Sequence, residues 1–200
     1  MKLENIIKEL EFIKTIDDDQ EGLYHYNKLI ETLKNDLALK EAKKTTSGEK
    51  ITAIKKVINN KRTKERVYHG TIKTIDDNKM MFTDSYSVYI INKIDGLFEE
   101  AGETYPDLRN FFKNINRSDQ LNLNLADIKA TCKTTKKDEL VYIQGMNLGF
   151  NPDYLLNFIK ITGDGFNYYK HDKLLYAINY NTNEEAILLG CKEIIEKWKI

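Results

Sequence analysis

Apolar and polar residues alternate with the period of a helix most clearly in residues 151–162. Four large apolar residues fall on one side of the helical wheel: Tyr154, Leu155, Phe158 and Ile159. Asn151 suits the N-cap, and Pro152 suits the first helical position because its missing N–H needs no partner there. Gly163 then ends the pattern in a turn. The segment therefore predicts a helix whose apolar face packs on a sheet.

Two further stretches alternate with the period of a strand, and each follows a predicted helix. A helix over residues 49–60 precedes the first stretch, and the helix over residues 151–162 precedes the second. The predicted strands cover Val67 and Tyr68 with residues 71–75, then residues 80–84, 85–91, 166–169, 174–178 and 186–190. A helix followed by three strands thus occurs twice. This repeat predicts one α+β domain of two sheets and two helices over residues 47–200.

Residues 1–46 predict a helical arm in front of this domain. Apolar residues recur there at helical spacing on both sides of the polar break at residues 17–20, which predicts a helical hairpin. Isolated helices of this length are marginal in water, so their apolar stripes need a partner surface. That surface is either the rest of the chain or a second protein or subunit. Residues 192–199 predict a short amphipathic helix whose Trp198 packs on the core or at a subunit interface.

Charge is balanced over the whole chain but concentrated in one segment. The 200 residues include 31 Lys and Arg and 31 Asp and Glu, so no overall field attracts nucleic acid. Between Lys50 and Arg66, however, seven basic residues stand against one acidic residue, Glu65. Basic side chains on a helix and on the loop after it are what contacts to DNA phosphates require. The alternative is that these basic side chains form a solvated surface and bind nothing. The candidate DNA-binding residues are Lys55, Lys56, Lys61, Arg62, Lys64 and Arg66.

Several stretches resemble bacterial DNA polymerase sliding clamps, the beta clamp family. Residues 146–159, with the run Gly149-Phe150-Asn151, resemble the start of the helix in the last clamp domain, and residues 186–191 look like its closing strands. Residues 52–57, 68–73 and 81–88 are similar to the first half of a clamp domain. Ser85 and Ser87 stand where clamps usually have Gly and Arg. Residues 94–145 form an insert where clamps have a short connection. The run Tyr105–Arg109 of this insert resembles the run Phe-Pro-Asp-Tyr-Arg of clamps, which in that family follows the second half of a domain.

The resemblance implies a DNA-clamp-like domain of two helix-plus-three-strand halves behind a helical N-terminal arm. In that family, such domains form a ring whose helices face the DNA and contact phosphates without reading bases. Clamp subunits hold three such domains, whereas this chain has room for one. The chain therefore either builds a ring as a homo-oligomer or retains only a binding surface, and the sequence leaves both open.

The run Gln120-Leu121-Asn122-Leu123-Asn124 of the insert allows two interpretations. It resembles the Gln-Leu-x-Leu-Phe peptide by which partners dock on bacterial clamps, without the final Phe. Leu121, Leu123 and Leu125 also alternate as in a half-buried strand, and this is the interpretation that we favour.

The sequence carries no recognisable catalytic motif. Its three histidines lack metal-ligand spacing, and it has no Gly-rich phosphate loop and no nucleophile elbow. Cys132 and Cys191 are too far apart for a disulfide framework or a zinc site, and we expect both to be small buried residues. No apolar run reaches the roughly 20 residues that span a bilayer, and Met1–Glu4 does not begin a signal peptide. We therefore expect a cytoplasmic, noncatalytic protein without a cofactor, a metal or a membrane partner.

These observations favour a sequence-independent DNA-binding or replication accessory protein. Its expected partners are double-stranded DNA, a replication protein and further copies of the chain. The alternative is a protein–protein interaction module, such as an inhibitor or assembly factor, built on a clamp-like fold that does not bind DNA. The heavy use of Lys, Asn and Ile is typical of an AT-rich genome and, with the single-domain size, suggests a phage or plasmid gene.

Overall fold

The computed structural model describes residues 46–136 and 138–191, together with isolated helical positions of the N-terminal arm. Those positions are Ile6, Ile7, Leu10, Glu11, Leu23, Tyr26, Asn27, Leu29, Ile30, Leu33 and Lys34. The rest of the predicted arm and the predicted helix over residues 192–199 lie outside the described residues. The chain divides into two compact units, Met1–Ile51 with Ile94–Leu97 and Thr52–Lys93 with Phe98–Ile200.

In the first unit, one ion pair joins the two predicted helices of the arm. The Nζ of Lys34 lies 2.6 Å from the Oε1 of Glu11. Both side chains are about half exposed, so this pair contributes at most about 1 kcal/mol to stability. Ile7 and Ile30 are buried.

In the second unit, helix α5 (Pro152–Thr162) begins and ends where the sequence predicts. The Oδ1 of Asn151 accepts hydrogen bonds from the backbone N–H groups of Asp153 and Tyr154, at 3.0 and 3.3 Å. Gly163 ends the helix with a φ of 71°, which glycine adopts without a steric penalty. The fully buried side chains of the helix include Leu155, Phe158 and Ile159. The ring of Phe158 lies 6.0 Å from that of Tyr89 in the sheet, so the apolar face packs as predicted.

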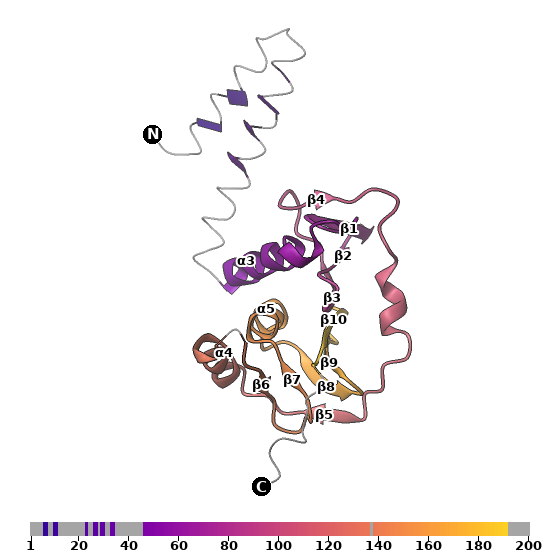
Figure 1. Cartoon of the computed structure of the whole chain (residues 1–200). Coiled ribbons are helices and arrows are strands. Elements are labelled where there is room, and N and C mark those ends of the chain that lie inside the picture. Colours follow the sequence, from indigo (N-terminus) through magenta and orange to yellow (C-terminus); the bar gives the residue numbers. More distant parts are fainter. Residues whose placement is uncertain are drawn as a thin grey trace. The chain divides into compact units, whose positions relative to one another are not determined.

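The predicted strands form the centre of one eight-stranded sheet (Figure 1). They are β1 (Thr71–Asp76), β2 (Lys79–Thr83), β3 (Ser87–Asn92), β8 (Asn167–His171), β9 (Leu174–Asn179) and β10 (Glu184–Leu189). Two short strands, β4 (Glu99–Glu100) and β5 (Asp119–Leu121), form the edges in the order β4-β1-β2-β3-β10-β9-β8-β5. Neighbouring strands are antiparallel except for the parallel pair of β1 and β4. A separate antiparallel pair joins β6 (Val141–Tyr142) to β7 (Gly149–Phe150).

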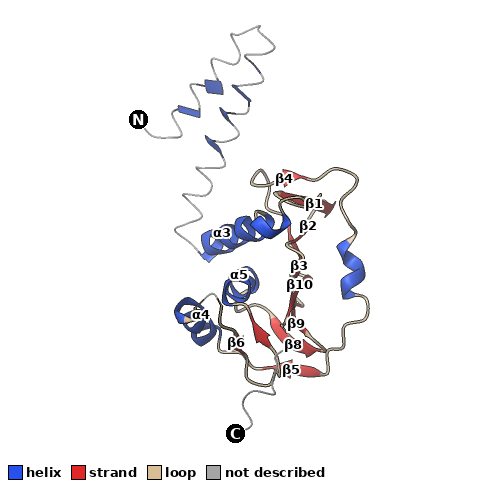
Figure 2. Ribbon diagram, viewed as in Figure 1, coloured by secondary structure: helices blue, strands red, loops and turns tan. Residues whose placement is uncertain are grey.

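The helices α3 (Thr46–Ile58), α4 (Leu125–Thr134) and α5 lie on the same side of the sheet (Figure 2). Each half of the fold consists of a helix and the three strands that follow it, α3 with β1 to β3 and α5 with β8 to β10. The predicted helix-plus-three-strand repeat is therefore present, in an α+β fold whose described ranges 46–136 and 138–191 hold a large sheet and the helices α3, α4 and α5.

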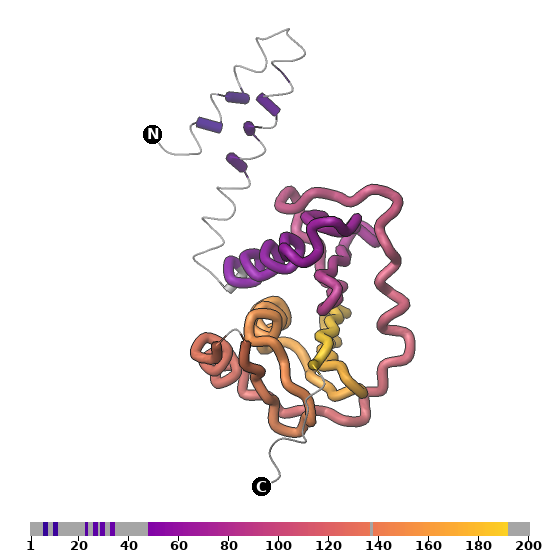
Figure 3. Tube along the Cα trace, viewed as in Figure 1, coloured from indigo at the N-terminus to yellow at the C-terminus, as the bar shows by residue number. Residues whose placement is uncertain are grey.

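The opposite face of the sheet is covered by residues 98–121, which we call the belt. The belt starts at β4, crosses the face with the 3-10 helix η2 (Leu108–Phe112) and ends at β5 on the other edge (Figure 3). Its buried side chains are Ala101, Tyr105, Leu108 and Phe112. They pack against sheet residues that include Met81, Val88, Tyr176 and Ile187. Arg117 at the end of the belt lies 3.2 Å from Glu185 and stacks over Tyr176.

The prediction of two sheets is wrong, because β3 and β10 pair directly. Their antiparallel register runs from Glu185 opposite Ile90 to Leu188 opposite Ser87. This pairing joins residues of the two halves that are 95 to 101 positions apart in sequence, so no local pattern reveals it.

Several boundaries also differ from the sequence-based prediction. Val67 and Tyr68 lie in turns before β1, and Ser85 lies in the turn between β2 and β3 with a φ of 72°. The strand predicted through Leu121, Leu123 and Leu125 stops at Leu121, and Leu125 begins α4. Asn124 causes this change, because its Oδ1 accepts hydrogen bonds from the first N–H groups of the helix. Cys132 is buried as expected, but Cys191 is exposed.

Within the described part of the chain, no helix combines the length and the apolar character that crossing a membrane requires.

Replacement of Phe112 by Ala tests the packing of the belt. The substitution removes a buried ring and leaves a cavity, so we expect the free energy of unfolding to fall by about 3 kcal/mol. The neighbouring Phe111 is 60% exposed and provides a matched control. Phe111→Ala should change the same quantity by about 0.5 kcal/mol or less. Urea unfolding followed by circular dichroism measures both, and two equally small effects would contradict the packing of the belt on the sheet.

Candidate nucleic-acid interface

The part of the basic segment that follows α3 belongs to a compact loop over residues 59–70, which leads to β1 and which we call the basic loop. Asn60 caps the 3-10 helix η1 (Lys61–Thr63), since its Oδ1 accepts a hydrogen bond from the backbone N–H of Arg62 at 3.1 Å. The Thr63 hydroxyl donates to the Asn60 carbonyl at 2.8 Å. The loop closes where the N–H of Gly70 donates to the carbonyl of Ile58 at 2.8 Å. The basic side chains are therefore carried on an internally hydrogen-bonded loop.

The structure brings five of the six predicted basic residues together around two adjoining hollows. The first is a pocket of about 560 Å³ between the end of α3 and the start of α5. Its α3 side is lined by Lys56, Asn59, Asn60, Lys61 and Arg62. Its other walls are Asp84 and, at the start of α5, Asn151, Asp153, Tyr154, Leu156 and Asn157.

The second hollow, of about 610 Å³, shares two of these residues with the first. It is lined by Lys61, Arg62, Lys64, Glu65 and Arg66. Lys56, Lys61, Arg62, Lys64 and Arg66 are all exposed. Lys55 is the exception among the predicted residues, because it is half-buried on α3 and lines neither hollow.

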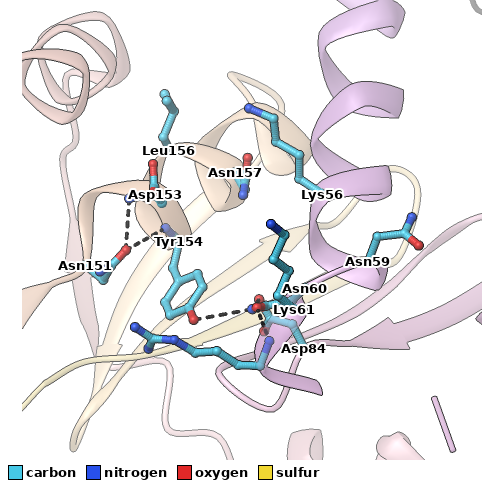
Figure 4. A pocket seen from close by; sticks show the side chains of 11 residues that line it. Lys56, Asn59, Asn60, Lys61, Asp84, Asn151, Asp153, Tyr154, Leu156 and Asn157 are labelled. Atoms are coloured by element: carbon cyan, nitrogen blue, oxygen red, sulfur yellow. Dashed lines mark hydrogen bonds between the residues drawn. The ribbon is translucent and has the colours of Figure 1, made fainter. Parts of the chain in front are cut away.

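A hydrogen-bonded network connects the basic loop to α5 at the floor of the first pocket (Figure 4). The Nδ2 of Asn60 donates to the hydroxyl of Tyr154 at 3.3 Å and to the Oδ2 of Asp84 at 3.4 Å. In Figure 4, Lys56 and Lys61 extend toward α5 above this network. The pocket therefore has hydrogen-bonding groups at its floor and ammonium groups at its side.

Arg62 is held against a pair of stacked tyrosines. The rings of Tyr86 and Tyr154 lie 4.8 Å apart at an angle of 19°, and the guanidinium carbon of Arg62 lies 5.9 Å from each ring centroid. Interaction with the Tyr86 hydroxyl raises the pKa of Arg62 further above its already high value, so its charge persists at every ordinary pH.

Asp84 stabilises the turn between β2 and β3 through its side-chain carboxyl. Its Oδ1 accepts hydrogen bonds from the N–H and the hydroxyl of Ser87, both at 2.8 Å, and from the N–H of Tyr86 at 3.0 Å. Burial raises the pKa of Asp84, and the hydrogen bonds from Ser87 oppose this shift. The three donors to Oδ1 belong to Tyr86 in the turn and to Ser87, the first residue of β3. This carboxyl therefore fixes the turn that carries Tyr86.

Sequence reasoning missed the polar and aromatic part of the site. In the sequence, Tyr154 is one of several apolar positions of an amphipathic helix. Tyr86 is one position of a predicted strand. Asn60 is 94 residues from Tyr154 in sequence, so their hydrogen bond leaves no local pattern. The only local signal was the pair Asn59-Asn60 directly before the basic loop. Among the described residues, no group of three or more His, Cys, Asp or Glu side chains is placed to hold a metal ion.

Comparisons with known proteins identify no relative of this chain. No protein-family model, no curated protein and no solved structure matches it.

The raised pKa of Asp84 predicts a pH dependence of stability that Asp84→Asn removes. Because the pKa is raised in the folded protein, the contribution of this carboxyl is fully present below its ordinary value of 3.8. The contribution then decreases as the pH rises through the raised value. The amide of the variant keeps an oxygen for the three donors of the turn but cannot titrate. We therefore expect the free energy of unfolding of the wild type to fall relative to that of Asp84→Asn as pH increases over this range.

Urea unfolding of both proteins at a series of pH values from about 3.5 upward measures this difference. A difference that stays constant over the series would show that Asp84 has the same pKa in the folded and unfolded chains.

Proposed function

We propose that this chain binds double-stranded DNA through its phosphates, without reading the bases, as a noncatalytic replication accessory protein of the cytoplasm. The observation that carries the proposal is the group of five exposed cations around two adjoining hollows, Lys56, Lys61, Arg62, Lys64 and Arg66. Each cation near a phosphate releases condensed counterions, and this release supplies most of the affinity of sequence-independent binding.

The charges of these five cations are not neutralised by ion pairs within the part of the chain that the structure describes. None of the five side chains forms an ion pair with a described Asp or Glu, and Glu65 is the one acidic residue among them in sequence. Their charge is therefore available to a polyanion such as the DNA backbone.

The arrangement of the fold supports a clamp-like interpretation of this surface. The sequence resemblance to sliding clamps implies two helix-plus-three-strand halves with helices on the DNA-facing side, and the basic loop continues directly from α3 on that side. Clamps usually have Gly at the position that Ser85 occupies in this chain. Ser85 has a φ of 72°, a conformation that glycine adopts most readily.

Binding of a fluorescent duplex, measured by anisotropy over a salt series, tests the proposal. We expect wild-type affinity to fall steeply with salt, with a slope of about −0.9 per phosphate contacted, and to be the same for unrelated sequences. Lys61→Glu/Lys64→Glu should weaken binding and reduce the slope by about two contacts. Lys55→Glu should have a smaller effect than Lys61→Glu, because Lys55 lines neither hollow.

The control carries the same change of net charge at another place. Lys133→Glu/Lys136→Glu alters two exposed lysines at the end of α4, outside both hollows. If the control weakens binding as much as Lys61→Glu/Lys64→Glu, the binding depends on overall charge and not on the basic loop. If the wild type does not bind duplex even at low salt, the alternative of a protein–protein interaction module replaces this proposal.

A further inference from the structure

The first pocket is more than a set of cations, because an aromatic ring and several amides line it together with the lysines. Its volume of about 560 Å³ lies within the range of about 300–1,000 Å³ that is typical of ligand sites. A duplex presents phosphates to such a surface but keeps its bases stacked inside the helix. The aromatic and amide groups of the pocket would therefore remain unused in duplex binding.

We propose that this pocket takes one unpaired nucleotide of single-stranded DNA, with its base against Tyr154 and its phosphate beside Lys56 and Lys61. The inference rests on the proposed DNA binding and adds to it a preference for single-stranded regions. Single-stranded nucleic acids are bound in this way by aromatic side chains in a positively charged groove, where stacking is tolerant of sequence.

The ring of Tyr154 is fixed in place before any ligand arrives. It stacks on Tyr86 at 4.8 Å, accepts a hydrogen bond from Asn60 at 3.3 Å and has Arg62 beside it. A ring that is already ordered loses little conformational entropy when a base stacks on it, so more of the stacking energy appears as affinity.

Two amides of the pocket keep hydrogen-bonding capacity for a base or sugar. The side chain of Asn157 makes no hydrogen bond to the described residues. Asn59 donates from its Nδ2 to the carbonyl of Lys55 at 2.9 Å, which leaves its Oδ1 as an acceptor. Amide side chains both donate and accept, and can therefore pair with the edges of different bases.

The second hollow indicates a strand and not a free nucleotide. It continues from the pocket through the shared residues Lys61 and Arg62 to Lys64 and Arg66. A mononucleotide would occupy only the pocket, whereas the next phosphates of a strand have further cations to contact. Asp153 is the one exposed carboxylate on the wall of the pocket, and it is outnumbered there by Lys56, Lys61 and Arg62.

Titration of the full chain with four probes tests this inference. The probes are an oligothymidylate strand, an abasic strand of the same length, a duplex of the same length, and thymidine monophosphate. We expect the wild type to bind oligothymidylate about tenfold more tightly than the abasic strand, because only the former can stack. Thymidine monophosphate should bind far more weakly than the strand.

Three variants identify the groups responsible. Tyr154→Leu should abolish the difference between oligothymidylate and the abasic strand, since stacking on the ring supplies that difference. Tyr154→Phe keeps the ring and should retain the difference. Asn157→Ala changes a partly exposed side chain with little risk to folding, and should weaken oligothymidylate binding selectively.

The outcomes separate this inference from the proposed function. Duplex binding with no difference between oligothymidylate and the abasic strand would overturn the inference and leave the proposed function intact. A difference that persists in Tyr154→Leu would place the stacking site elsewhere and also overturn it. Thymidine monophosphate binding as tightly as the strand would identify a nucleotide site instead, and absence of binding to every probe would remove both proposals.

Discussion

The antiparallel pairing of β3 with β10 is the contact on which the rest of the structure depends. Each half of the fold ends in one of these strands, and their pairing turns two three-stranded ladders into one sheet. It is reinforced at one end, where the Oε1 of Glu184 accepts a hydrogen bond from the N–H of Asn92 at 3.1 Å. Because each helix precedes the three strands of its half, joining the halves this way brings α3 and α5 to the same side. The pocket between them is a consequence of that arrangement.

A continuous sheet creates a second requirement, because its strands carry apolar side chains on both faces. In β2, Phe82 stacks on Tyr89 on the side of α5, while the neighbouring Met81 points to the opposite face. Burial of such side chains supplies roughly 25 cal/mol for each Å² of apolar surface removed from water, so an uncovered second face would be a large loss. The belt meets this requirement with aromatic and aliphatic residues of the insert. The insert is thus part of the core and not an appendage.

The sequence allowed the local elements to be predicted and left their assembly open. Helix α5 could be predicted because Asn151, Pro152 and Gly163 mark its ends and its apolar residues share one face. Helix α4 was missed, although Asn124 followed by Asp127 is a recognisable helix start, because the alternating leucines before it read as a strand. The basic loop could be predicted from charge alone. The tyrosine pair and Asn60 could not, since the contacts that give them a role join distant segments.

The belt has a consequence for how copies of this chain can associate. An open sheet usually invites growth by hydrogen bonding of another strand to its free edge. Here both edges are occupied by strands of the belt itself, with two residues in β4 and three in β5, and the exposed residues of β4 are glutamates. Such short and partly charged edges are poor templates for strand addition. Strand addition at these edges is therefore a poor route for copies of this chain to associate, and the belt lowers the risk of uncontrolled polymerisation.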